Sequence, residues 1–207
     1  MSVEVVLILV ILLTAIVVHE YAHGWTAYRF GDSTAKMAGR LTLNPIRHID
    51  PVGTVILPAI FFVLRLMGYH VIPLGWAKPV PVNFMKLRNP KRDMIWVALA
   101  GPAVNIAMAL AASFLIKFLN LPVAGYEFLG TIIFVNLLLA VFNMMPIPPL
   151  DGSRVLMGLL PIKLARPYSR LEPFGLVIIV GLLYLGVFEK IIIPVVKLLG
   201  AYLGVQI

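Results

Sequence analysis

The chain has 207 residues, of which 61% are hydrophobic and only 13% are charged. Soluble domains carry about 25% charged and about 45–50% apolar residues, so this composition excludes an ordinary soluble protein and indicates a protein embedded in a lipid bilayer. The absence of cysteine excludes disulfides and thiolate metal sites, and the net charge of +8 does not indicate nucleic-acid binding, because the basic residues lie between the apolar runs.

Apolar stretches follow one another along the chain and predict an all-α polytopic membrane protein, organised as a single integral membrane domain over residues 1–207. Three segments, at about 5–28, 94–119 and 128–150, predict a three-helix catalytic core. Two further apolar runs, 174–188 and 191–203, predict one or two C-terminal helices. These runs leave no room for a folded module outside the membrane.

The basic residues predict the orientation of the chain. Lys and Arg concentrate in residues 29–47, 78–92 and 154–170, whereas residues 118–153 contain neither. Short basic loops stay in the cytoplasm, so the N-terminus is expected outside the cell. Both ends of residues 52–69 then lie on the cytoplasmic side, and this apolar segment is expected to be re-entrant or a hairpin. A spanning helix is the alternative.

The stretch HEYAH, residues 19–23, places ionisable side chains inside the first apolar helix. His19 and His23 are four residues apart and share one helical face, with Glu20 beside them. Measured from Glu4, His19 lies about 22 Å along the helix, below the middle of a hydrocarbon layer about 30 Å thick. The pattern H-E-x-x-H is typical of zinc metalloproteases, in which the histidines bind the metal and the glutamate is the general base. A polar face that lines a transport path is the alternative.

A catalytic zinc site takes three protein ligands and a water, so a third ligand must come from another segment. Asp151 lies in NMMPIPPLDG, residues 143–152, where the third core helix reaches the level of the histidines. The prolines of this stretch prevent a regular helix just before Asp151. An ordinary turn before Gly152 is the alternative reading of Asp151. His48 and His70 are expected to be loop histidines rather than ligands.

These motifs resemble the site-2 protease family of intramembrane zinc metalloproteases. HEYAH, GPAVN at residues 101–105 and NMMPIPPLDG carry the resemblance, which covers roughly residues 1–160. The resemblance implies one Zn²⁺ per chain and Glu20 as the catalytic base, with three zinc ligands: His19, His23 and Asp151. It also implies that Asn105 and Asn143 line the site and bind the substrate backbone. Hydrogen bonding between helices is the alternative role for both asparagines.

The resemblance further implies a multi-pass protein of the cell membrane with its active site toward the cytoplasm. Its expected activity is cleavage of transmembrane-helix protein substrates by attack of a metal-activated water. The chain is expected to have no room for the PDZ domain or the nucleotide-binding regulatory domain of larger family members, so regulation is expected to be absent or to come from a membrane partner or a homo-oligomer. The alternative function is a metal-ion transporter or metal-binding membrane protein that uses the same polar helix face.

Two stretches between the helices predict short extended strands in the cytoplasmic gaps. WAKPVPVNF, residues 76–84, has the proline placement of an edge strand, and KMAGRLTL, residues 36–43, alternates in polarity. A substrate helix must unwind to be cut, and an edge strand offers its backbone new hydrogen bonds. Ordinary loops are the alternative.

Overall fold

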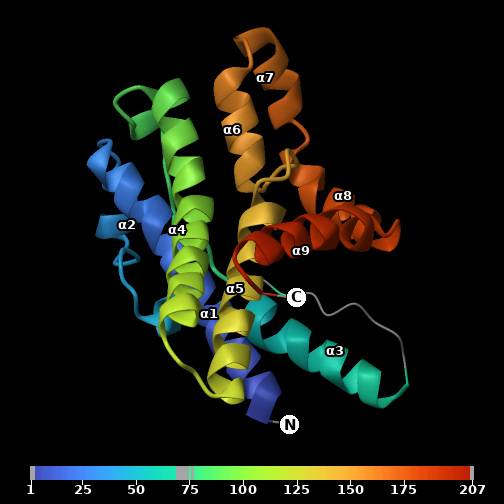
Figure 1. Cartoon of the computed structure of the whole chain (residues 1–207). Coiled ribbons are helices and arrows are strands. Elements are labelled where there is room, and N and C mark those ends of the chain that lie inside the picture. Colours follow the sequence, from blue (N-terminus) through green and yellow to red (C-terminus); the bar gives the residue numbers. More distant parts are fainter. Residues whose placement is uncertain (1–2, 69–74, 76, 206–207) are drawn as a thin grey trace.

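The computed structural model describes residues 3–68, 75 and 77–205, and the described chain is helical, with no β-strand. Three helices, α1 (Val3–Arg29), α4 (Pro90–Phe118) and α5 (Val123–Asn143), pack side by side at its centre (Figure 1). Each of the three is long and apolar enough to cross a membrane. The expected three-helix core is therefore present, although its third helix ends at Asn143 rather than near residue 150.

Small side chains on α4 let the neighbouring helices approach. Ala109 and Ala112 are buried in a cluster with Ile133 and Leu137 of α5. Without large side chains at these α4 positions the two backbones come close and gain dispersion contacts, which drive helix association where there is no water to exclude. The close packing of α4 against α1 helps to position the histidines of the site described below.

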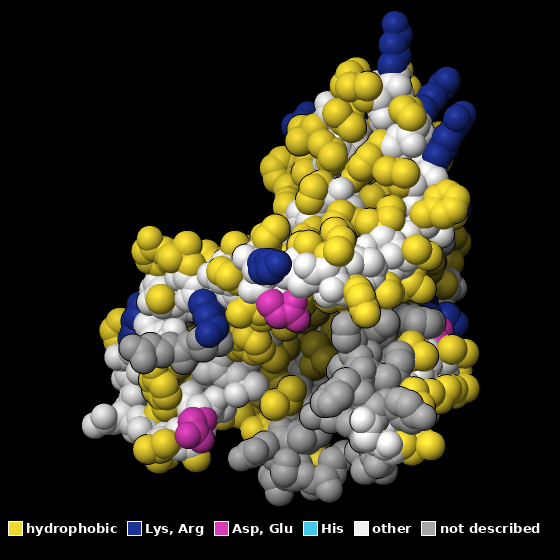
Figure 2. Space-filling model, turned by 90° about the vertical axis from the view of Figure 1, so that its right-hand side faces the viewer, with side chains coloured by type: hydrophobic (Ala, Val, Ile, Leu, Met, Phe, Trp, Pro, Cys, Tyr) yellow, Lys and Arg dark blue, Asp and Glu magenta, His cyan; other side chains and the backbone are white. Residues whose placement is uncertain are grey.

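The outward faces of the same helices are apolar. Leu110 and Phe114 of α4 are 52% and 60% exposed, and an apolar run on α1 from Val6 to Val10 is exposed as well. Figure 2 shows hydrophobic side chains over much of one described face, with Lys and Arg projecting where α6 and α7 form one end of the molecule. Large exposed apolar surface of this kind suits contact with lipid.

The segment between α1 and α4 contains α2 (Thr34–Met37), the short helix η1 (Pro45–His48), the π-helix η2 (Pro51–Ile56) and α3 (Leu57–Leu66). Asp50 caps η2, because its Oδ1 accepts the backbone N–H groups of Val52 and Gly53 at 3.0 and 2.7 Å. α3 extends away from the central helices (Figure 1) and has only 10 residues. The re-entrant path of residues 52–69 stays a prediction, and residue 69 lies outside the described part of the chain.

The expected extended strands are not found among the described residues. α2 includes the first residues of the 36–43 stretch, so that part of the expectation is wrong: Asp32 accepts the N–H of Thr34 at 3.0 Å and starts a helical turn there. In the 76–84 stretch, residue 76 is not described, residues 77–83 have no regular secondary structure, and η3 (Phe84–Lys86) follows.

The basic gap after α5 contains two helices that hydropathy did not indicate. α6 (Asp151–Leu159) and α7 (Ile162–Ser169) form a hairpin beyond the end of α5 (Figure 1). Both are short and carry polar residues, so neither appears as an apolar run. Gly158 lets α6 lie close to α4, since a Cβ there would overlap with the side chain of Ile95. α6 is thus held against the helix that also supports the histidines.

The two C-terminal apolar runs form separate helices, α8 (Gly175–Tyr184) after the short η4 (Glu172–Phe174), and α9 (Ile193–Tyr202) after the π-helix η5 (Phe188–Ile192). Ile162–Tyr184 and Phe188–Tyr202 are bent by 71° to one another. Val196 of α9 packs into the cluster that joins α4 and α5.

Candidate metal centre and active site

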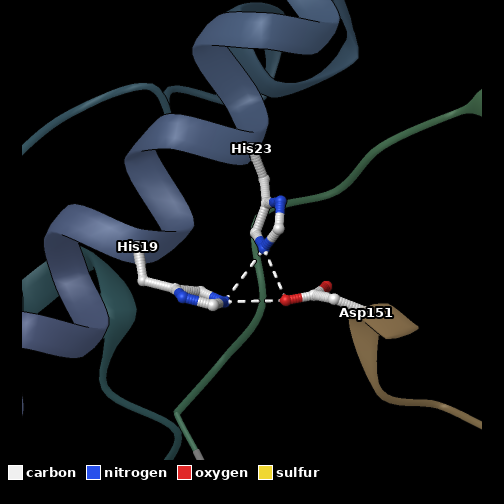
Figure 3. Close-up of side chains that lie close together, drawn as sticks. All are labelled: His19, His23 and Asp151. Carbon is white, nitrogen blue, oxygen red and sulfur yellow. Dashed lines mark hydrogen bonds and ion pairs between the residues drawn. The ribbon is translucent and has the colours of Figure 1, made fainter. Parts of the chain in front are cut away.

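Three side chains from two distant segments converge in the interior. His19 and His23 point from one face of α1 toward Asp151, the first residue of α6 (Figure 3). The two Nε2 atoms lie 2.9 Å apart, and Asp151 Oδ2 lies 3.1 Å from that of His19 and 3.2 Å from that of His23. The two histidines are buried and Asp151 is nearly so. The structure therefore brings together the three residues that the motifs single out as metal ligands.

The loop before Asp151 is built by its prolines. α5 ends at Asn143, and tight turns follow in which Ile147 N–H donates to Met145 O and Leu150 N–H donates to Ile147 O, both at 2.8 Å. Gly152 completes the turn, because a Cβ at this position would overlap with the backbone carbonyl of Met144. The loop folds back on the end of α5, and Asp151 is consequently placed at the first turn of α6, facing α1.

The GPAVN motif of α4 lies directly against the two imidazoles. A Cβ at Gly101 would overlap with Nε2 of both His19 and His23, so only glycine permits this approach of α4 to α1. The Nδ1 atoms are turned away from Asp151 toward α4. His23 Nδ1 donates to Val97 O at 2.7 Å, and His19 Nδ1 lies 2.6 Å from Asn105 Oδ1.

The donor set fits a metal cation. Asp151 Oδ2 is buried and has no hydrogen-bond partner by geometry among the described residues. Because Nδ1 of His23 carries the proton given to Val97 O, its Nε2 offers a lone pair to the site when the ring is neutral. Two imidazole nitrogens and one carboxylate oxygen form the usual protein ligand set of a catalytic zinc site.

Glu20 lies beside these residues and is held by an irregular segment. Its Oε2 accepts the N–H of Val80 at 2.7 Å. We call residues 77–83 the strap. Glu20, Val80 and the three converging side chains line one cavity of about 580 Å³, which also exposes Asn143. The Glu20 carboxylate and the three candidate metal ligands thus line the same cavity.

The strap is anchored from the α1 side by residues that the motifs do not reveal. The buried carboxylate of Asp32 accepts the N–H of Asn83 at 2.6 Å, and Arg40 Nη2 donates to Lys78 O at 2.6 Å. Gly24 gives Val80 room, since a Cβ at Gly24 would lie 2.7 Å from Val80 Cγ1. The sequence indicates that Asp32, just after α1, is a turn residue, and only the tertiary structure shows that it also holds the strap.

The two asparagines are placed differently. Asn143 lines the cavity, and its Nδ2 donates to Leu139 O of its own helix at 3.0 Å. Asn105 is fully buried, with Oδ1 beside His19 Nδ1 and Nδ2 donating to Asn136 Oδ1 at 2.8 Å. This position favours hydrogen bonding between helices over contact with substrate. His48 is buried at the end of η1, where its Nε2 lies 2.9 Å from Thr42 O, and His70 lies outside the described residues.

Comparison with known proteins agrees with this geometry. The model of peptidase family M50 matches residues 7–127 and 121–186. The chain is 35% identical to YwhC of Bacillus subtilis over 182 residues, which are 83% of this chain and 77% of YwhC. It is 32% identical to Rip2 of Mycolicibacterium smegmatis over 176 residues, and the match spans 83% of this chain but only 64% of Rip2. No solved structure matches the chain.

The chain therefore belongs to peptidase family M50, the site-2 protease family that its motifs resemble. The family and the naming of these relatives as zinc metalloproteases support a zinc metalloendopeptidase with several membrane helices.

Proposed function

We propose that this chain is an intramembrane zinc protease that holds one Zn²⁺ between His19, His23 and Asp151 and cleaves transmembrane segments of other membrane proteins. The observation that supports this best is the convergence of two imidazole nitrogens and a buried carboxylate oxygen beside Glu20, at the wall of a cavity between spanning helices. A bound Zn²⁺ would supply Lewis acidity at this point. The residues of the chain supply the remaining chemistry.

Glu20 is the proposed general base. Its carboxylate takes a proton from the attacking water and later gives that proton to the amide nitrogen that leaves. The Val80 N–H holds one of its oxygens, Oε2, at the cavity wall. Asn143, which also lines the cavity, is the proposed contact for the substrate backbone. Asn105 is assigned to the support of His19 instead, because both of its polar atoms are hydrogen-bonded within the protein.

We place the N-terminus outside and the site toward the cytoplasm. Lys91 and Arg92 begin α4 at the end where α6 and α7 lie, and Lys163, Arg166 and Arg170 are in or next to α7. Basic residues are typical of the cytoplasmic side. Because the chain has no cysteine, labelling of single introduced cysteines from either side would test this orientation directly.

Removal of Asp151 tests the metal assignment. We expect the purified wild-type chain to contain one zinc, and Asp151→Ala to lose most of its zinc and all cleavage of a model transmembrane substrate. Asp50→Ala is the matched control, because it removes a carboxylate that caps η2 and lies outside the converging triad. Metal analysis and gel assays measure both properties. Equal zinc content in wild type and Asp151→Ala would contradict the proposed ligand set.

The strap is the proposed docking segment for an unwound substrate. Val80 and Val82 both line the cavity, and alternate residues of an extended segment present their N–H groups to the same edge. Val82→Pro removes one N–H, and loss of one hydrogen bond of about 1 kcal/mol should lower kcat/KM about fivefold without loss of zinc. Val82→Ala keeps the N–H and should cleave normally. Normal cleavage by Val82→Pro, or by prolines placed throughout residues 78–84, would show that the substrate does not pair with the strap.

A further inference from the structure

A chain of hydrogen bonds leads from His19 into the core of the bundle and crosses three helices. His19 Nδ1 on α1 lies 2.6 Å from Asn105 Oδ1 on α4. Asn105 Nδ2 donates to Asn136 Oδ1 on α5 at 2.8 Å, and Asn136 Nδ2 donates to the backbone carbonyl of Ile132 at 2.9 Å. Asn105 and Asn136 are both fully buried. Because both side chains are closed to bulk solvent, their amide groups are hydrogen-bonded within the protein.

The last hydrogen bond, to the Ile132 carbonyl, determines which groups donate and which accept along the whole series. The carbonyl of Ile132 can only accept, so the amide nitrogen of Asn136 must face it. Asn136 then presents its oxygen to Asn105, which answers with its own nitrogen and turns its oxygen toward His19. With the amides reversed, Asn136 would place an oxygen against the Ile132 carbonyl, an acceptor against an acceptor in a dry site. Such an unsatisfied buried contact is strongly unfavourable.

The direction of these hydrogen bonds determines the tautomer of His19. An amide oxygen beside Nδ1 requires a proton on Nδ1, which leaves the lone pair of the neutral ring on Nε2. Nε2 is the atom that lies 3.1 Å from Asp151 Oδ2. His23 reaches the same state by a shorter route, because its Nδ1 donates straight to the Val97 carbonyl. Thus a backbone carbonyl orients each imidazole, directly for His23 and through two asparagines for His19.

We propose that Asn136 is a positioning residue for the metal site, which it influences through Asn105 although it touches neither metal nor substrate. The proposal rests on the proposed function for its consequence, namely tighter zinc binding by a pre-oriented His19. Partners of metal-binding histidines affect metal affinity about 10–100-fold. The tautomer itself follows from the hydrogen bonds alone and holds with or without metal.

Zinc affinity, measured by competition with a chelator, tests the consequence. Asn136→Leu removes the acceptor for Asn105 and should weaken zinc binding about tenfold. Asn136→Asp should bind like the wild type, because a carboxyl group buried among these helices stays protonated, donates to Ile132 O and accepts from Asn105. Thr131→Val is the control, since the Thr131 hydroxyl donates to Glu127 O within α5, outside this hydrogen-bond network. Wild-type affinity in Asn136→Leu, or equal weakening in Asn136→Asp, would overturn the proposal.

The ring nitrogens of His19 give a second test that does not require an altered core. The chain has 4 histidines, so ¹⁵N-histidine NMR of the metal-free protein at alkaline pH is assignable with single variants. We expect a protonated Nδ1 and an unprotonated Nε2 for His19 in the wild type. A proton on Nε2 instead would overturn the proposed direction of the hydrogen bonds from His19 to Ile132. If the wild type bound no zinc, the proposed function would fail, while this spectrum would still decide the direction of the hydrogen bonds.

Discussion

Glu20→Gln should abolish peptide-bond cleavage and leave zinc binding unchanged. Glutamine has nearly the same size, and its oxygen can still accept the Val80 N–H, so the strap keeps its contact with α1. What the variant loses is a group able to take and return a proton, which contributes about 10²–10⁴-fold to such reactions. The three atoms that converge on the metal position belong to other residues, so their geometry should remain. Cleavage rate and zinc content, measured on the same preparation, check both parts.

The same variant separates a protease from a metal carrier. A carrier that uses this polar face would keep most of its zinc transport in Glu20→Gln when assayed in vesicles, and the wild type would cleave nothing. Glu127→Gln is the matched control, because Glu127 is an exposed residue of α5 away from the triad. Cleavage by Glu20→Gln at the wild-type rate would remove Glu20 from the proposed chemistry, whatever its zinc content.

Gly101→Ala should destroy zinc binding although it changes no proposed ligand. The added methyl group would overlap with Nε2 of both imidazoles, the two atoms that face the metal position. Either both rings rotate, or α4 moves away from α1 and takes with it Val97 O and Asn105, the partners of both Nδ1 atoms. We therefore expect zinc affinity to fall more than about 100-fold, with a loss of stability of about 1–3 kcal/mol from overpacking.

Gly181→Ala provides the control for Gly101→Ala. Gly181 lies in α8, and a Cβ there would meet no atom of the described residues within 4 Å, so zinc binding and cleavage should be unchanged. Zinc affinity from chelator competition and the midpoint of thermal unfolding distinguish a lost site from an unfolded chain. A folded Gly101→Ala protein with wild-type zinc affinity would contradict the close approach of α4 to the histidines.

Local spacing and hydropathy in the sequence already specify part of this protein. The four-residue interval between His19 and His23 places both rings on one face of any helix, and long apolar runs locate α1, α4 and α5 without tertiary information. Asp151 was also within reach, because the prolines before it end a helix and the topology places that end at the depth of the histidines. These inferences use only one helix at a time, together with its position relative to the membrane.

Features that depend on how helices face one another become visible only in the folded protein. The hydrogen bond from Val80 to Glu20 and those from His19 through Asn105 to Asn136 join residues between 31 and 86 positions apart. The need for glycine at position 101 depends on the contact between α4 and α1. Hydropathy also missed α6 and α7, because their polar residues interrupt any apolar run. The physical reason is that helix periodicity specifies which side chains share a face, whereas the rotation and separation of packed helices come from the sum of many side-chain contacts across the bundle.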